Sequence, residues 1–146
     1  MNQYQHVQIL LVEDSVQDAE LTRLALKRHN VANDVAWVRD GVEAIDYLLC
    51  QGEYAGRDSG SPKLVLLDMK MPRMDGMQVL ARLKANDSTK AIPVVMLTSS
   101  REESDLVESY ALGVNSYIVK PVDFEQFADT VSQVGMYWVL ANQTAT

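Results

Sequence analysis

LVLLD, residues 64–68, is a run of four apolar side chains that ends at the carboxylate of Asp68. Such a run is typical of a strand that is buried on both faces of a parallel sheet. A parallel sheet brings the last residue of each strand to its carboxyl edge, where proteins of this architecture place their sites. The stretch therefore predicts a central strand that presents one acidic group at the functional edge of a sheet.

Two similar apolar runs also end at charged residues. The run ILLV is followed by Glu13 and Asp14, and the run YIV is followed by Lys120. If the strands that lead to Asp14 and Asp68 are neighbours, three carboxylates share one small space. Like charges that close cannot all stay ionised without a cation. The sequence therefore predicts an acidic cluster with a lysine beside it.

The composition limits the classes of protein to which the chain can belong. The chain has 146 residues, 47% of them hydrophobic and 23% charged, which fits one globular domain. The net charge of -7 argues against a general nucleic-acid surface, because phosphate binding needs clustered Lys and Arg. No apolar run could span a membrane and no leader opens the chain, so we expect no membrane contact. Since the single Cys50 can form no internal disulfide, we expect a cytosolic, cytoplasmic protein.

Apolar runs alternate with helix-capping pairs along the chain. The predicted strands are residues 7–12, 34–38, 64–68, 93–98 and 117–119. The predicted helices begin at the pairs Ser15/Asp18, Asp40/Glu43, Asp75/Gln78, Ser100/Glu103 and Asp123/Gln126. This alternation predicts an α/β fold, the doubly wound (βα)5 flavodoxin-like sheet, with five parallel strands in the order 2-1-3-4-5 and helices on both faces.

Two local patterns complete the predicted fold. In the first helix, Leu21, Leu24, Ala25 and Arg28 lie on one face at helical spacing. Residues 51–63 hold three glycines, a proline and two serines, which predicts an exposed loop within the domain.

The side chains at the carboxyl edge suit phosphoryl chemistry. Carboxylate oxygens are ligands for Mg²⁺, an ion that also binds phosphate oxygens. Lys120 adds a positive charge, and Thr98, at the end of the fourth strand, adds a hydroxyl. A nucleophilic carboxylate, a metal ion, a cation and a hydroxyl donor together could hold a phosphoryl group on an oxygen.

The chain resembles the receiver domains of response regulators in two-component signalling, over about the first five-sixths of its length. Its matching residues are Glu13, Asp14, Asp68, Met71, Pro72, Asp75, Gly76, Thr98, Tyr117, Lys120 and Pro121. The loop GEY at 52–54 and the tail YW at 137–138 resemble small regulators associated with bacterial, including cyanobacterial, phytochromes. We expect a single receiver domain over residues 1–146, with a core at about 7–135 and an apolar helical extension at about 136–141.

The resemblance implies a phosphoacceptor site. Asp68 would accept a phosphoryl group from a phosphohistidine on a sensor histidine kinase such as a phytochrome. Asp14 would bind Mg²⁺ directly together with Asp68, Glu13 would help through water, and the backbone carbonyl of Lys70 would be a further ligand. The protein would be no enzyme beyond supporting its own phosphotransfer and a slow autodephosphorylation.

The resemblance also implies a switch. Lys120 would contact the phosphoryl group, and its bond to Pro121 is a candidate cis peptide. Thr98 would move to a phosphoryl oxygen and Tyr117 would turn into the vacated space, changing the face of the fourth helix, fifth strand and last helix. This face would signal to a partner, and we expect a homodimer through it. The apolar residues 136–140 either belong to that contact or pack back on their own sheet.

Three other classes of protein stay open. A flavodoxin-like cofactor binder shares the strand order but cradles a phosphate with the loop after its first strand, where this chain has Glu13 and Asp14. A hydrolase of the haloacid-dehalogenase type carries a second Asp two residues after its nucleophile, where this chain has Lys70. A receiver-shaped adaptor regulated without phosphorylation would not need the acidic pair and Lys120. Lys70 lies beside the path of an attacking water, which predicts that Lys70→Asn changes the phosphoryl lifetime.

Overall fold

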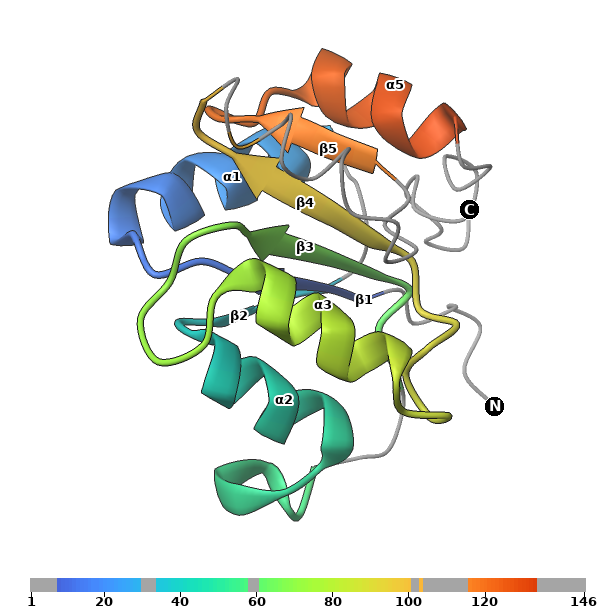
Figure 1. Ribbon diagram of the computed structural model, residues 1–146. Helices are drawn as coiled ribbons and strands as arrows, with labels where there is room; N and C mark the ends of the chain where they lie inside the picture. The colour runs from blue at the N-terminus through green and yellow to red at the C-terminus, as the bar shows by residue number, and fades with distance from the viewer. Residues whose placement is uncertain (1–7, 30–33, 58–60, 101–102, 104–115, 134–146) are drawn as a thin grey trace, which may run out of the picture.

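The computed structural model describes residues 8–29, 34–57, 61–100, 103 and 116–133. Its core is one parallel sheet in the order β2-β1-β3-β4-β5, so the predicted strand order is confirmed (Figure 1). The strands are β1 Gln8–Val12, β2 Asp34–Val38, β3 Leu64–Asp68, β4 Val94–Thr98 and β5 Ser116–Val119. β1 and β3 are neighbours, which brings their carboxyl ends together.

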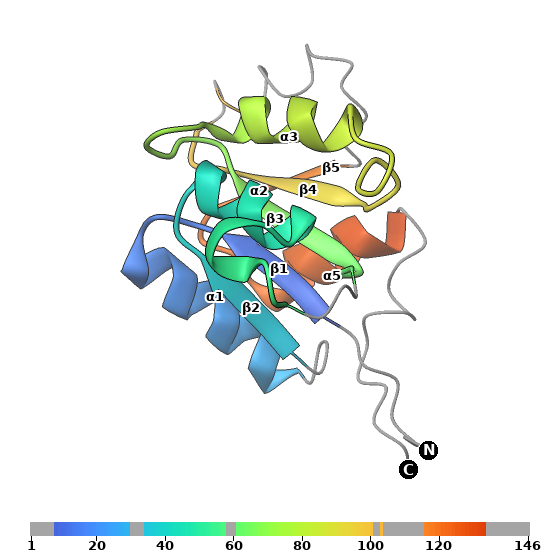
Figure 2. The same cartoon turned by 90° about the horizontal axis from the view of Figure 1, so that it is seen from below.

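Helices cover both faces of the sheet. They are α1 Val16–Arg28, α2 Gly41–Leu49, α3 Gly76–Lys84 and α5 Phe124–Gln133, with a short 3-10 helix, η1 Gly52–Tyr54, after α2. α1 and α5 lie on one face, and α2 and α3 lie on the other (Figure 2). The helix predicted after Ser100, apart from Glu103, and the predicted extension at 136–141 lie outside the described residues.

The two helical layers explain why the central strands are apolar throughout. Every residue of β3 and β4 is buried. Val65 and Leu67 pack in the cluster of α2 and α3, whereas Leu64 and Leu66 pack in the cluster of α1 and α5. Because alternate residues point to opposite faces, a strand covered on both sides needs an uninterrupted apolar run.

The predicted apolar face of α1 is not the buried one. Ala19, Thr22 and Leu26 are buried, whereas Leu21 is 52% exposed and Leu24 is 47% exposed. The buried residues follow helical spacing, but they include a small side chain and a hydroxyl that suit close packing on the sheet. The hydrophobic pattern therefore predicted a face of α1 that lies next to the face that the structure buries.

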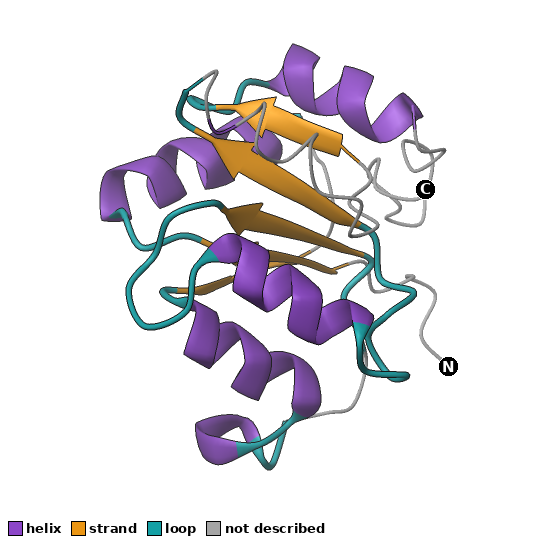
Figure 3. Cartoon of the chain, in the orientation of Figure 1, coloured by secondary structure: helices purple, strands orange, loops and turns teal. Residues whose placement is uncertain are grey.

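The loops that follow the strands gather at one edge of the sheet (Figure 3). Helix N-caps mark where two of these loops end. Ser15 Oγ accepts from Asp18 N at 3.2 Å at the start of α1, and Asp75 forms a capping box with Gln78 at the start of α3. Each strand end is thereby fixed close to the helix that follows it. No helix in the described part of the chain has the length and apolar character that a membrane span requires.

Candidate functional site

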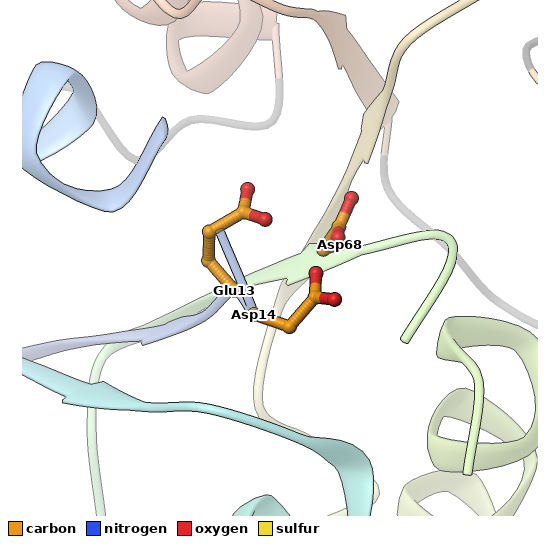
Figure 4. Close-up of side chains that lie close together, drawn as sticks. All are labelled: Glu13, Asp14 and Asp68. Carbon is orange, nitrogen blue, oxygen red and sulfur yellow. The ribbon is translucent and has the colours of Figure 1, made fainter. Parts of the chain in front are cut away.

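Three carboxylates meet at the carboxyl edge between β1 and β3. One oxygen each of Glu13, Asp14 and Asp68 lies within 4.8 Å of the others, and Figure 4 shows the three groups facing a common space. Val12 is the register partner of Leu67, so the residues that follow these two are side by side. Glu13 and Asp68 are buried, whereas Asp14 is exposed. The structure thus brings together the acidic residues that the sequence placed at neighbouring strand ends.

Lys120 is shared among three carboxylates. Its Nζ lies 3.0 Å from Glu13 Oε1, 3.0 Å from Asp68 Oδ1 and 3.1 Å from Asp18 Oδ2. The sequence predicted a lysine beside the acidic cluster but treated Asp18 only as part of a helix cap. Side chains on a helix tilt toward its N-terminus, and Asp18 lies in the first turn of α1. That position could have signalled its approach to the site.

The charges of this cluster do not balance within the chain. Burial raises the pKa of Asp68 to about 7, the neighbouring charge of Glu13 adds to the rise, and Lys120 only partly opposes it. Burial alone would lower the pKa of Lys120, but the carboxylates of Asp68 and Glu13 outweigh it and raise the pKa. One ammonium cannot neutralise several carboxylates, so the site attracts a further cation.

The donor set fits a hard divalent ion with oxygen ligands. Both oxygens of Glu13 already have partners in the chain: Oε1 accepts from Lys120 at 3.0 Å and Oε2 accepts from Ser15 N at 3.2 Å. Asp14 is exposed on the solvent side of the cluster. Asp14 and Asp68 are thus better placed than Glu13 to bind an ion directly.

The remaining sequence-predicted residues lie on adjacent strands. Thr98 is fully buried at the end of β4, and the residue before it, Leu97, is the register partner of Asp68. Tyr117 on β5 is half-buried and packs against the core cluster under α2 and α3. The peptide bond between Lys120 and Pro121 is cis, as predicted.

Two residues beside the site make contacts that the sequence did not predict. The indole nitrogen of Trp37, on β2, donates to the backbone oxygen of Glu13 at 2.7 Å. Glu103 is buried; its carboxylate accepts from Ser99 N at 2.9 Å and Ser99 Oγ at 3.1 Å, and lies 3.5 Å from Lys70 Nζ. The sequence predicted a capping role for Glu103, and its backbone N–H does donate to Ser100 Oγ at 3.2 Å. Its link to Lys70 depends on the fold.

A doubly wound sheet with this acidic cluster and a lysine at its carboxyl edge is the architecture of receiver-type signalling domains. The chain belongs to the family of response regulator receiver domains, whose model matches residues 9–132. It is therefore a response regulator of two-component signalling, a class of signalling proteins that are not classical enzymes. Receiver domains bind Mg²⁺ or Mn²⁺ at their acidic pocket. No comparison supports the alternative classes of protein considered above.

Several similar proteins are response regulators, and some of them are described as phytochrome response regulators. The structure of the bacteriophytochrome response regulator AtBRR is 52% identical, with a TM-score of 0.88 over 94% of this chain and 99% of that one. Response regulator Rcp1 of Synechocystis sp. is 40% identical over 131 residues, which are 90% of this chain and 88% of Rcp1. The Mn²⁺-bound structure of Rcp1 has a TM-score of 0.72 at 39% identity, covering 96% of this chain and 97% of that one. The phosphorylated cyanobacterial phytochrome response regulator RcpA has a TM-score of 0.74 at 41% identity, covering 92% of this chain and 95% of that one.

Proposed function

We propose that this chain is a single-domain response regulator, residues 1–146, whose phosphoacceptor is Asp68. The observation that carries the proposal is a buried carboxylate at the end of β3, 3.0 Å from Lys120, inside a cluster that fits a divalent cation. In the transfer, an oxygen of Asp68 attacks the phosphorus of a kinase phosphohistidine. The P–O bond forms, the P–N bond breaks, and the imidazole keeps the electron pair and takes up a proton.

Mg²⁺ is the cation that we propose for this site. Asp14 and Asp68 would hold it together with the backbone carbonyl of Lys70, and Glu13 would contribute through water. When bound, the ion supplies positive charge for the phosphoryl oxygens. Glu13 would also position Lys120, because its carboxylate contacts the Lys120 ammonium and holds it at the site.

Lys120 is the proposed phosphoryl contact. The raised pKa keeps this side chain charged at neutral pH. Its position 3.0 Å from Asp68 Oδ1 lets it pass from the carboxylate to an oxygen of the phosphoryl group with little movement. The ammonium then stabilises the charge that the transfer delivers to a buried position.

Thr98 and Tyr117 form the proposed switch. Thr98 lies at the end of the strand beside Asp68, where its hydroxyl can move toward a phosphoryl oxygen. Tyr117 is half-buried on β5, and a shift of Thr98 would open space for its ring. Phosphorylation would then bias two pre-existing arrangements of the face formed by β5, α5 and the helix predicted after Ser100.

The proposed partners are a sensor histidine kinase and a second copy of this chain. A phytochrome is the proposed kinase, because relatives of this chain are described as phytochrome response regulators. The homodimer would form through the switch face, where Val119 on the edge strand β5 is 41% exposed and would lie in the contact. A cytoplasmic location, no nucleic-acid contact and slow autodephosphorylation belong to the same proposal.

Acetyl phosphate tests the phosphoacceptor directly. The protein is incubated with acetyl phosphate and Mg²⁺, and its intact mass is measured. We expect one added phosphoryl group on the wild type and none on Asp68→Asn. Asp75→Asn is the matched control, because it changes an exposed carboxylate at the same edge to another good helix cap and should label normally. Labelling of Asp68→Asn equal to wild type would refute the assignment.

Light scattering tests the dimer. The mass in solution is measured at high concentration with and without a phosphoryl mimic, for the wild type and for Val119→Asp. We expect a dimer that the substitution weakens. A wild type that stays monomeric in both conditions contradicts the proposed self-association but leaves the phosphoacceptor assignment intact.

A further inference from the structure

We propose that Glu103 controls the lifetime of the aspartyl phosphate by holding the ammonium of Lys70 away from the phosphoryl group. The inference rests on the proposed function of Asp68 as the phosphoacceptor. It assigns Glu103 a positioning role: Glu103 does not contact the reacting atoms, and it acts through the side chain of Lys70.

Glu103 and Lys70 form an unequal ion pair. Glu103 Oε2 lies 3.5 Å from Lys70 Nζ, with the carboxylate side chain 8% exposed and the lysine side chain 80% exposed. A buried carboxylate needs compensation, which here comes from the N–H and hydroxyl of Ser99 and from Lys70. The carboxylate is therefore the fixed partner, and the lysine on its flexible stem is the partner that can leave.

The pair lies at the carboxyl edge of the sheet, beside the strand that ends at Asp68. Lys70 lies two residues after Asp68, in the loop that leads to α3, whereas Ser99 directly follows Thr98 at the end of β4. β3 and β4 are adjacent, with Asp68 opposite Leu97. The ion pair thus joins the loops after these two strands, and Lys70 begins within side-chain reach of a phosphoryl group on Asp68.

Phosphorylation would make two anions compete for this lysine. A phosphoryl group on Asp68 carries more negative charge than the single carboxylate of Glu103. Hydrolysis requires a water oxygen to attack phosphorus as the bond to the Asp68 oxygen breaks, which gives inorganic phosphate and the free carboxylate. An ammonium lying over the phosphoryl oxygens obstructs that approach. Glu103, by retaining Lys70, keeps the path open and the lifetime short.

Glu103→Gln separates the charge of this residue from its hydrogen bonds. The amide oxygen can still accept from Ser99, but the attraction for Lys70 is lost. We expect the half-life of the phosphorylated protein to lengthen roughly two- to five-fold, the range set by the strength of a partly exposed ion pair. In a Lys70→Met background, Glu103→Gln should leave the half-life unchanged.

The experiment follows the loss of the phosphoryl group by intact mass after removal of acetyl phosphate. It compares the wild type, each single variant and the double variant. Asp87→Asn is the matched control, since it removes a carboxylate from an exposed lysine pair, with Lys90, in the turn after α3; its half-life should equal that of the wild type. Sensitivity to Lys70 is a readout that a purely structural role of Glu103 would not give.

Each other result overturns the inference. An unchanged half-life in Glu103→Gln shows that the charge is irrelevant. A change of the same size in the Lys70→Met background shows that Glu103 acts through Ser99 instead. A wild type that takes up no phosphoryl group removes the proposed function itself, and with it this inference, whereas normal labelling with unaltered decay removes the inference alone.

Discussion

Arg73 and Asp40 form a two-point ion pair that ties the loop after β3 to the start of α2. Arg73 Nη2 lies 2.8 Å from Asp40 Oδ2 and 3.0 Å from Oδ1, and Nε lies 3.1 Å from Oδ2. Burial alone would raise the pKa of Asp40, but the backbone N–H of Glu43 and the Arg73 guanidinium outweigh it and lower the pKa. Arg73 has a φ of 66°, a left-handed conformation uncommon for side-chain-bearing residues. The ion pair thus accompanies an unusual turn in the loop that carries Lys70.

Asp40 combines a helix cap with this ion pair, and the two contributions can be separated. Asp40→Ala removes both and is expected to lower the free energy of unfolding by about 1–2 kcal/mol, most of it from the cap. Asp40→Asn keeps a capping side chain and loses only the charge, so it should cost at most about 1 kcal/mol, as should Arg73→Gln. Urea denaturation measures all three variants. Equal losses for Asp40→Ala and Asp40→Asn would contradict a capping contribution.

The sequence predicted the strand order and the residues at the site because both depend on local patterns. Asp14, Asp68 and Lys120 each follow an apolar run directly or at one remove, so parallel strands bring them to one edge whatever the details of packing. Capping by Ser15 and Asp75 was visible for the same reason, since a cap involves residues only three positions apart.

Contacts between distant loops could not be predicted in this way. The pairing of Arg73 with Asp40 and of Lys70 with Glu103 depends on loop conformation and on which rotamer each side chain adopts. The exposure of Leu24 shows a second limit: neighbouring stripes of α1 have similar spacing, and only the shape of the sheet decides which one is buried. The sequence therefore predicted which residues meet at the acidic cluster better than it predicted the contacts between the loops around that cluster.

Trp37 should report cation binding. Its indole nitrogen donates to the backbone oxygen of Glu13 at 2.7 Å, and Glu13 directly precedes Asp14 in the chain. The guanidinium carbon of Arg39 lies 5.3 Å from the centroid of the Trp37 ring. An ion held by Asp14 and Asp68 changes the field at this ring. We expect Mg²⁺ to change the tryptophan fluorescence of the wild type, and the change to vanish in Trp37→Phe. Trp138→Phe, the control, should keep the response; equal responses in Trp37→Phe and the wild type would disprove the assignment.

Gly76 lies too close to the end of β3 to carry a side chain. A Cβ at this position would clash with the backbone oxygen of Asp68 and would lie 2.9 Å from Met96 Cε. Contacts this short force the backbone apart, and overpacking typically costs about 1–3 kcal/mol. Gly76→Ala should destabilise the protein by that amount and weaken Mg²⁺ binding, both measurable by urea denaturation with and without the ion. Gly56→Ala, where a Cβ meets nothing within 4 Å, is the control.

Asp68 should make the metal-free protein less stable as the pH rises toward neutrality. Its pKa is about 7 in the folded protein because of burial, with Glu13 adding to the rise, against an ordinary value of 3.8. Between these values the folded chain keeps a proton that the unfolded chain has released, so the free energy of unfolding falls with rising pH. The loss is complete above the folded pKa and absent below the unfolded one. From the size of the shift it amounts to about 1–4 kcal/mol.

Asp68→Asn isolates this contribution from the other titrating groups. Without metal, the variant and the wild type should be about equally stable near the unfolded pKa. As the pH rises to about 7, the free energy of unfolding of the variant should increasingly exceed that of the wild type, and above pH 7 the difference should stay constant. Saturating Mg²⁺ should reduce or reverse this advantage, because a bound cation lets Asp68 ionise without penalty and stabilises the folded wild type. A stability difference independent of pH in metal-free buffer would mean that Asp68 titrates normally, and the charge imbalance inferred for the cluster would then be absent.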